Sequence, residues 1–186
     1  LALRSRAFLL IVASVLALQL SAALMQRMAP FLQEHGVDLT GAGVLIAVLS
    51  VATTAVTILL GVLNDRLGPL RMMWAAIALG GSGLLTLIVA QGFVPLAGGL
   101  LLAAWGYALP GVLVSLVVLA VFGPRDFVAI LGPTMAMMPL GMSIGAPLWG
   151  LVHDLTGAYF PGLWMAAGLC LAAGGMITLA VRGGAS

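Results

Sequence analysis

Six long apolar stretches, separated by short polar breaks, constrain the fold of this chain more than any other feature. A helix needs about 20 mostly apolar residues to cross the hydrocarbon core of a bilayer. Helices are the expected spanning elements because the alternating strands of a membrane barrel, about ten residues each, have no counterpart in the sequence. An all-α, polytopic membrane protein is predicted, with six transmembrane helices at Phe8–Met28, Gly43–Leu63, Met72–Ala90, Leu96–Val121, Val128–Val152 and Phe160–Val181.

The charge content indicates that lipid is the solvent for most of the surface. Only 6% of the residues are charged, against about 25% in a typical soluble domain. Cys170 is the single cysteine, so the chain can form neither an internal disulfide nor a thiolate metal site. The basic residues form no cluster longer than Arg4 to Arg6, so nucleic acid is not an expected partner. No metal and no cofactor is predicted.

The arginines predict the orientation, because loops on the cytoplasmic side of a membrane carry an excess of basic residues. The side with more arginines also holds both termini, and its arginines are Arg4, Arg6, Arg66, Arg71, Arg125 and Arg182. The other side carries Arg27, near the end of the first helix, together with Glu34, Asp38 and Asp154. A multi-pass protein of the cell membrane with both termini of this chain in the cytoplasm is predicted.

Two copies of the pattern G-x-x-x-D-x-x-G begin at Gly61 and Gly150, 89 residues apart. Each copy follows the second helix of a set of three. Because three is odd, the second set would run through the membrane upside down relative to the first. Inverted repeats of this kind are typical of secondary transporters. Two inverted three-helix repeats are predicted, at about 1–93 and 94–186, with chance similarity in a chain of 25 glycines as the alternative.

The first copy resembles the loop motif G-x-x-x-D-R-x-G-x-x-R of the major facilitator superfamily. The matching residues are Gly61, Asp65, Arg66, Gly68 and Arg71. The sequence departs from the family pattern at Pro69-Leu70, where a basic residue is frequent. Three further segments are loosely similar to monocarboxylate and oxalate/formate-like members, namely Pro30 to Val37, Phe122 to Phe127 and His153 to Tyr159.

The resemblance implies that residues 1–186 form the C-terminal half of a twelve-helix transporter, and an N-terminal six-helix half is the expected partner. The start at Leu1 rather than Met is expected for a cut through a longer chain, with a misassigned start as the alternative. The implied function is secondary active transport of a small solute by alternating access. A coupling proton or a counter-transported solute is expected, and an enzymatic activity is not.

The loop motif is expected to act as a conformational lock that closes the cytoplasmic side. Asp65 is predicted just before the third helix, where a carboxylate would meet the positive end of the helix dipole. Arg66 and Arg71 are predicted to contact anionic lipid and to pair with Asp65. Gly61 is expected to let a neighbouring helix approach closely. The alternative is an ordinary basic loop without a gating role.

A candidate substrate path follows from helical periodicity and from the resemblance. One face of the second helix carries Ser50, Thr53, Thr54 and Thr57. Helix packing, with hydroxyls bonded back to their own helix, is the alternative interpretation of this stripe. By resemblance the first and fourth helices line the cavity, which adds Gln19, Ser21, Gln26, Arg27, Trp105, Tyr107 and Ser115. Pairing with Glu34 or Asp38, or a position turned toward the membrane surface, is the alternative for Arg27.

Two other classes of protein fit part of the sequence. Gly141-Met142-Ser143-Ile144-Gly145 matches the G-x-S-x-G pattern of serine hydrolases, including intramembrane proteases. His153, the nearest candidate base, lies ten residues further on, about 15 Å along the same helix. The pair Gly141 and Gly145 is also a G-x-x-x-G motif, which favours close helix packing. A self-contained six-helix membrane subunit that binds a partner is the remaining alternative.

Overall fold

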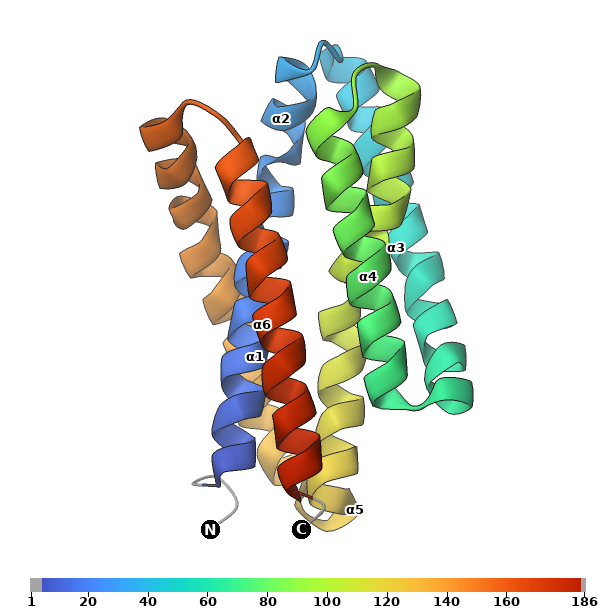
Figure 1. Cartoon of the computed structure of the whole chain (residues 1–186), viewed down its shortest axis with the longest axis vertical. Helices are drawn as coiled ribbons and strands as arrows, with labels where there is room; N and C mark the ends of the chain where they lie inside the picture. The colour runs from blue at the N-terminus through green and yellow to red at the C-terminus, as the bar shows by residue number, and fades with distance from the viewer. Residues whose placement is uncertain (1–4, 185–186) are drawn as a thin grey trace.

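The computed structural model describes residues 5–184, and every regular element in this range is a helix (Figure 1). Five of its helical stretches are long and apolar enough to cross a membrane, which defines a multi-pass membrane protein. The first stretch, Arg6–Glu34, contains three consecutive elements. The elements are α1 (Arg6–Ala22), the 3-10 helix η2 (Ala23–Arg27), α2 (Met28–Glu34), α3 (Leu39–Leu67), α4 (Pro69–Val89), α5 (Phe93–Thr156) and α6 (Phe160–Gly184).

Local chemistry sets the helix ends. The Ser5 hydroxyl accepts a hydrogen bond from the Phe8 amide at 3.1 Å, and the Asp38 carboxylate accepts one from the Gly41 amide at 3.1 Å. Such caps satisfy amides that have no partner inside the helix. The first helical stretch extends beyond the predicted span, which ended at Met28, because α2 continues to Glu34. Pro30 lies in the first turn of α2, where the missing amide hydrogen of proline costs nothing.

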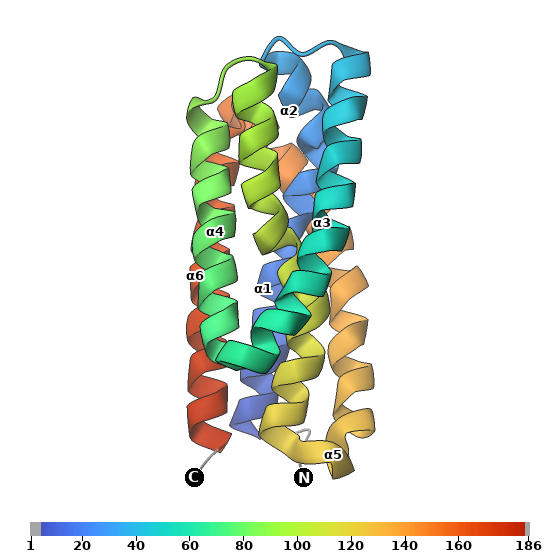
Figure 2. The same ribbon diagram turned by 90° about the vertical axis from the view of Figure 1, so that its right-hand side faces the viewer.

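α5 contains two of the predicted spans. Its 64 residues would form a straight helix of about 96 Å, roughly three times the thickness of the hydrocarbon core. Gly123 interrupts it, with φ 70° and ψ 178°, a backbone region that essentially only glycine adopts. Figure 2 shows the chain turning back at this bend, so that segments 93–122 and 124–156 run along the bundle in opposite directions.

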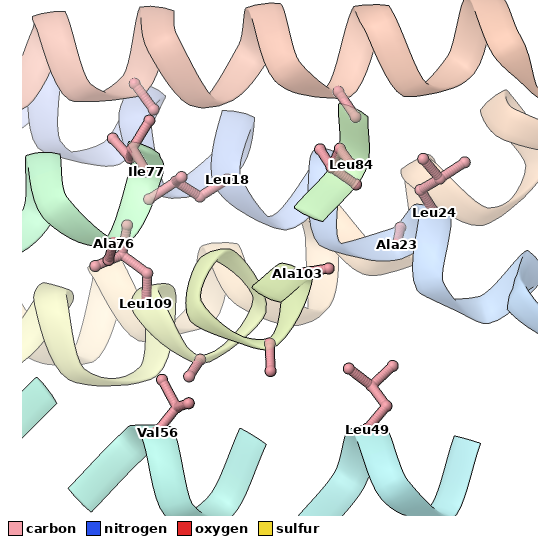
Figure 3. Close-up of a cluster of buried hydrophobic side chains, with 14 of the residues drawn as sticks. Leu18, Ala23, Leu24, Leu49, Val56, Ala76, Ile77, Leu84, Ala103 and Leu109 are labelled. Carbon is pink, nitrogen blue, oxygen red and sulfur yellow. The ribbon is translucent and has the colours of Figure 1, made fainter. Parts of the chain in front are cut away.

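The helices are arranged in three pairs when the bundle is viewed as in Figure 2. α4 and α6 lie on one side, segment 124–156 and the first part of α3 lie on the other, and α1 and segment 93–122 lie between them, while the last part of α3 crosses over to meet α4. The core therefore lies along the middle pair. Figure 3 shows Leu49 and Val56 pointing from α3 toward segment 93–122, which carries Ala103 and Leu109.

Glycines allow the closest helix contacts. A Cβ added at Gly83 would lie 2.2 Å from the backbone nitrogen of Ala103, so α4 and segment 93–122 touch backbone to backbone. The predicted close packing at the G-x-x-x-G motif is confirmed. A Cβ at Gly141 would lie 2.5 Å from the Gln19 Cβ of α1, and one at Gly145 would lie 2.5 Å from the Ala23 Cβ.

The two ends of the bundle differ in charge. The described termini, the α3–α4 turn and the bend of α5 lie at one end, here called the arginine-rich end (Figures 1 and 2). These segments carry Arg6, Arg66, Arg71, Arg125 and Arg182. Arg4, which was predicted on the same side, lies outside the described residues. The opposite end, here called the histidine end, holds α2 and the α5–α6 turn, with Glu34, His35, His153 and Asp154.

Candidate functional site

The hydroxyl stripe of α3 is bonded to its own helix. Ser50 donates to the Ile46 carbonyl at 2.9 Å, and Thr53, Thr54 and Thr57 donate in the same way, each to the carbonyl four residues earlier. Ser50, Thr54 and Thr57 are exposed. The stripe thus faces away from the core, and its hydroxyl protons are already donated.

The loop motif lies at the arginine-rich end, with a geometry that corrects one prediction. Asp65 lies in the last turn of α3, at the negative end of that helix, while α4 begins only at Pro69. Asp65 thus lies inside α3 and not between the two helices, and its interaction with the positive end of α4 stays a prediction. No ion pair joins Asp65 to Arg66 or Arg71 within residues 5–184, although all three charges are close in sequence and exposed. Gly61 is open, since an added Cβ would meet no atom within 4 Å.

The two copies of the glycine–aspartate pattern end their helices alike. The Gly68 amide donates to the Asn64 carbonyl at 2.8 Å, and the Gly157 amide donates to the His153 carbonyl at 2.7 Å. Both glycines have a positive φ, 79° and 68°. Each residue of the second cap lies 89 positions after its counterpart in the first. The first cap lies at the arginine-rich end and the second at the opposite end.

A compact polar cluster joins α2 to the end of α5. His153 Nε2 lies 3.2 Å from Glu34 Oε1, and His153 Nδ1 lies 3.8 Å from Asp154 Oδ1. The Tyr159 ring lies 4.3 Å from the His153 ring and 5.7 Å from the Phe31 ring, measured between centroids. Tyr159 is buried, and this burial, with the nearby Glu34 carboxylate, raises the pKa of its phenol. No sequence motif predicts the contact between Glu34 and His153, which are 119 positions apart in the sequence.

Arg27 lies beside this cluster. A Cβ added at Gly150 would lie 2.5 Å from an Arg27 guanidinium nitrogen, so the absence of a side chain at Gly150 makes room for the guanidinium. The expected pairing of Arg27 with Glu34 or Asp38 is not formed within residues 5–184, because Glu34 contacts His153 and Asp38 caps α3.

Ser21 and Tyr107 line a cavity of about 380 Å³ between α1, α4, segment 93–122 and α6. The Ser21 hydroxyl donates to the Ala166 carbonyl at 3.1 Å and lies 3.2 Å from the Cys170 sulfur. Five pairs of lining residues lie 89 positions apart in the sequence, the same offset as the repeat. They are Leu18 and Tyr107, Ile77 and Ala166, Ala78 and Ala167, Gly81 and Cys170, and Ser82 and Leu171.

The remaining candidates for a substrate path lie elsewhere. Gln19 packs against Gly141 at the contact between α1 and segment 124–156. Gln26 is exposed in η2, and Trp105 and Ser115 are half-buried on segment 93–122. The structure thus brings Ser21 and Tyr107 together, and it does not gather the predicted set around one cavity.

The alternative chemistries find no assembled site in the described range. The Ser143 hydroxyl donates to the carbonyl of Pro139 in its own helix, while His153 contacts Glu34. No group of three or more His, Cys, Asp or Glu side chains within residues 5–184 is placed to hold a metal ion.

Comparison with known protein families and with curated protein sequences found no match for this chain.

Proposed function

We propose that the chain crosses the membrane six times, as two inverted three-helix repeats, and acts as one half of a secondary transporter. The observation that carries this proposal is the paired construction of the bundle. α1 contacts α6 and segment 124–156, while segment 93–122 contacts α4 and α3. If α1, α3 and α4 are exchanged with segment 93–122, segment 124–156 and α6, respectively, each set of contacts becomes the other.

The 380 Å³ cavity supports the same symmetry, because five of its residue pairs share the repeat offset of 89. A cavity lined by equivalent positions of two repeats lies across the axis that relates them. In transporters built from inverted repeats, exchange of conformation between the two three-helix repeats opens the solute path alternately to each side of the membrane. The proposal places both termini of the chain in the cytoplasm of a cell, because the arginine-rich end carries five of the described arginines.

A second six-helix unit is the proposed partner, in the same chain or a separate one. The side formed by α3 and segment 124–156 exposes small and polar residues, which suit close contact between helices, among large apolar residues such as Val51 and Val128. Exposed examples are Ser50, Thr54, Thr57, Gly132, Pro139, Ser143 and Pro147. The solute would pass between the two units, with a proton or a counter-solute as the coupled species.

The lock at the α3–α4 turn is proposed in a form that fits the observed geometry. Gly61 is open and Asp65 is exposed, so both are available to the second unit. An exposed ion pair between Asp65 and the second unit would contribute about 0.2–1 kcal/mol. This shifts the balance between the inward-open and outward-open states up to about fivefold. In the complete transporter, Asp65→Asn should therefore slow turnover up to about fivefold and favour the inward-open state. Unchanged turnover and unchanged cysteine accessibility on both sides would reduce the motif to a topological anchor.

The half-transporter proposal is tested by reconstitution in proteoliposomes. The chain alone, shown to be monomeric, should give no solute uptake above empty vesicles. Addition of the second six-helix unit should give uptake that responds to an imposed proton or solute gradient. Uptake by the monomeric chain alone would contradict the proposal. A self-contained membrane subunit would instead bind its partner through the α3 side without catalysing uptake in either preparation.

A further inference from the structure

The cavity of about 380 Å³ has an apolar lining and an exposed apolar rim. Its deep wall consists of fully buried side chains such as Leu18 from α1, Ala103 from segment 93–122 and Ala166 from α6. Figure 3 shows Leu18 close to Ile77, with Leu84 farther along α4, all below the α6 ribbon. The rim carries Trp74 and Leu85 on α4, and Trp164 and Leu171 on α6, each between 39% and 56% exposed. The cavity is therefore a groove that opens sideways between α4 and α6.

The groove is closed toward the arginine-rich end. The Trp74 indole nitrogen donates to the Thr178 hydroxyl at 3.2 Å, which joins α4 to α6. A Cβ added at Gly174 would lie 2.8 Å from the Ile77 side chain, so the two helices are in direct contact there. The opening thus faces the side of the bundle and not the aqueous phase at this end.

The lining chemistry favours an apolar occupant, with the Tyr107 hydroxyl as a polar side-chain group on the lining that makes no hydrogen bond within residues 5–184. None of the residues around the groove is charged. The Ser21 hydroxyl donates to the Ala166 carbonyl and the Ser82 hydroxyl donates to the Leu79 carbonyl, so neither proton is free. A water molecule needs two to four polar partners to stay in a cavity, and apolar cavities of this kind stay dry. The volume lies within the range of about 300–1,000 Å³ found for bound small molecules.

We propose that this groove, here called the α4–α6 groove, holds one acyl chain of a membrane lipid. It is lined by the middle of α4 and the first half of α6, at the depth where a membrane-spanning helix meets hydrocarbon. Lipid chains are as apolar as leucine, so hydrophobicity does not drive them into the groove. Packing does, because the walls of an empty groove would lose the dispersion contacts of its missing occupant. This inference depends on membrane insertion and not on transport.

A phospholipid with a photoreactive group midway along one acyl chain tests the proposal. The protein is reconstituted in vesicles of phosphatidylcholine that contain this lipid, irradiated, and analysed by peptide mass spectrometry. Adducts should concentrate on residues 18–25, 74–85, 103–109 and 164–171, at least fivefold above the exposed residues of α3. Equal labelling of α3 and of the groove segments would overturn the proposal.

Matched glycine variants make the test specific. A Cβ at Gly81 meets no atom within 4 Å, and Gly81 lines the groove, so Gly81→Leu should fill the groove without a clash. Gly168 is equally open but does not line the groove, so Gly168→Leu is the control. Groove adducts should fall at least fivefold in Gly81→Leu and remain in Gly168→Leu. Ala167→Leu, from the opposite wall, replaces Gly81→Leu if that variant does not fold. Full adduct yield in a folded filling variant would contradict the assignment.

Discussion

At the scale of single residues, the pKa of Tyr159 depends on the polar cluster at the histidine end. Burial is the larger cause of its raised pKa, and the Glu34 carboxylate adds to it. The neutral phenol is therefore favoured in the folded protein. This stabilisation is fully present below pH 10, the ordinary pKa of tyrosine, and is lost as the pH rises through the higher pKa of the folded state.

Phenolate absorbance measures this shift. The chain has two tyrosines, so a Tyr107→Phe variant leaves Tyr159 as the only phenol. Its titration midpoint should lie above 10.0 in the folded protein. Adding Glu34→Gln should lower the midpoint while leaving it above 10.0, because burial remains. A midpoint at or below 10.0 before that second change would show that Tyr159 is not buried in the cluster.

The contact between His153 and Glu34 is the second prediction at this scale. Both side chains are partly exposed, 28% and 49%, so their interaction is screened by solvent. Exposed pairs of this kind contribute about 0.2–1 kcal/mol to the free energy of unfolding. A double-mutant cycle of Glu34→Gln and His153→Asn should return a coupling energy in that range. Glu34→Gln with His35→Asn is the control pair and should show no coupling.

At the scale of the elements, the contact between α4 and segment 93–122 depends on Gly83. An added methyl group would meet the Ala103 backbone, which cannot move as a side chain can. Gly83→Ala should therefore cost about 1–3 kcal/mol, the usual cost of overpacking. Gly81→Ala, two residues earlier on the same helix, meets no atom within 4 Å and should cost much less. Equal thermal stability of the two variants in detergent would contradict this backbone contact.

Elements and contacts differ in how far the sequence could predict them. The length and apolarity of the stretches were sufficient to predict the helices, because both properties can be read from a short stretch of sequence. The G-x-x-x-G motif likewise predicted a close contact, which Gly141 and Gly145 make with α1. The position of Asp65 was predicted wrongly because α3 continues through the motif to Leu67. The α4–α6 groove is formed by four helices, and the Glu34–His153 contact joins residues 119 positions apart, so no local pattern predicts either of them.

At the scale of the whole molecule, α5 decides the topology. Two crossings within α5 give six crossings and two inverted repeats, whereas a single crossing would leave five and abolish the symmetry. The bend at Gly123 lies at the arginine-rich end, and the end of α5 lies at the histidine end. The two ends of segment 124–156 should therefore be reached from opposite sides of the membrane.

Accessibility of single cysteines tests this directly. In a Cys170→Ser background, which has no cysteine left, four variants probe the two ends: Gln33→Cys, Leu67→Cys, Asp126→Cys and Leu155→Cys. All four positions are exposed. An impermeant maleimide added to intact cells should label the cysteines at 33 and 155, and should label those at 67 and 126 only after the membrane is permeabilised. Labelling of positions 126 and 155 from the same side would contradict the six-crossing, inverted-repeat architecture.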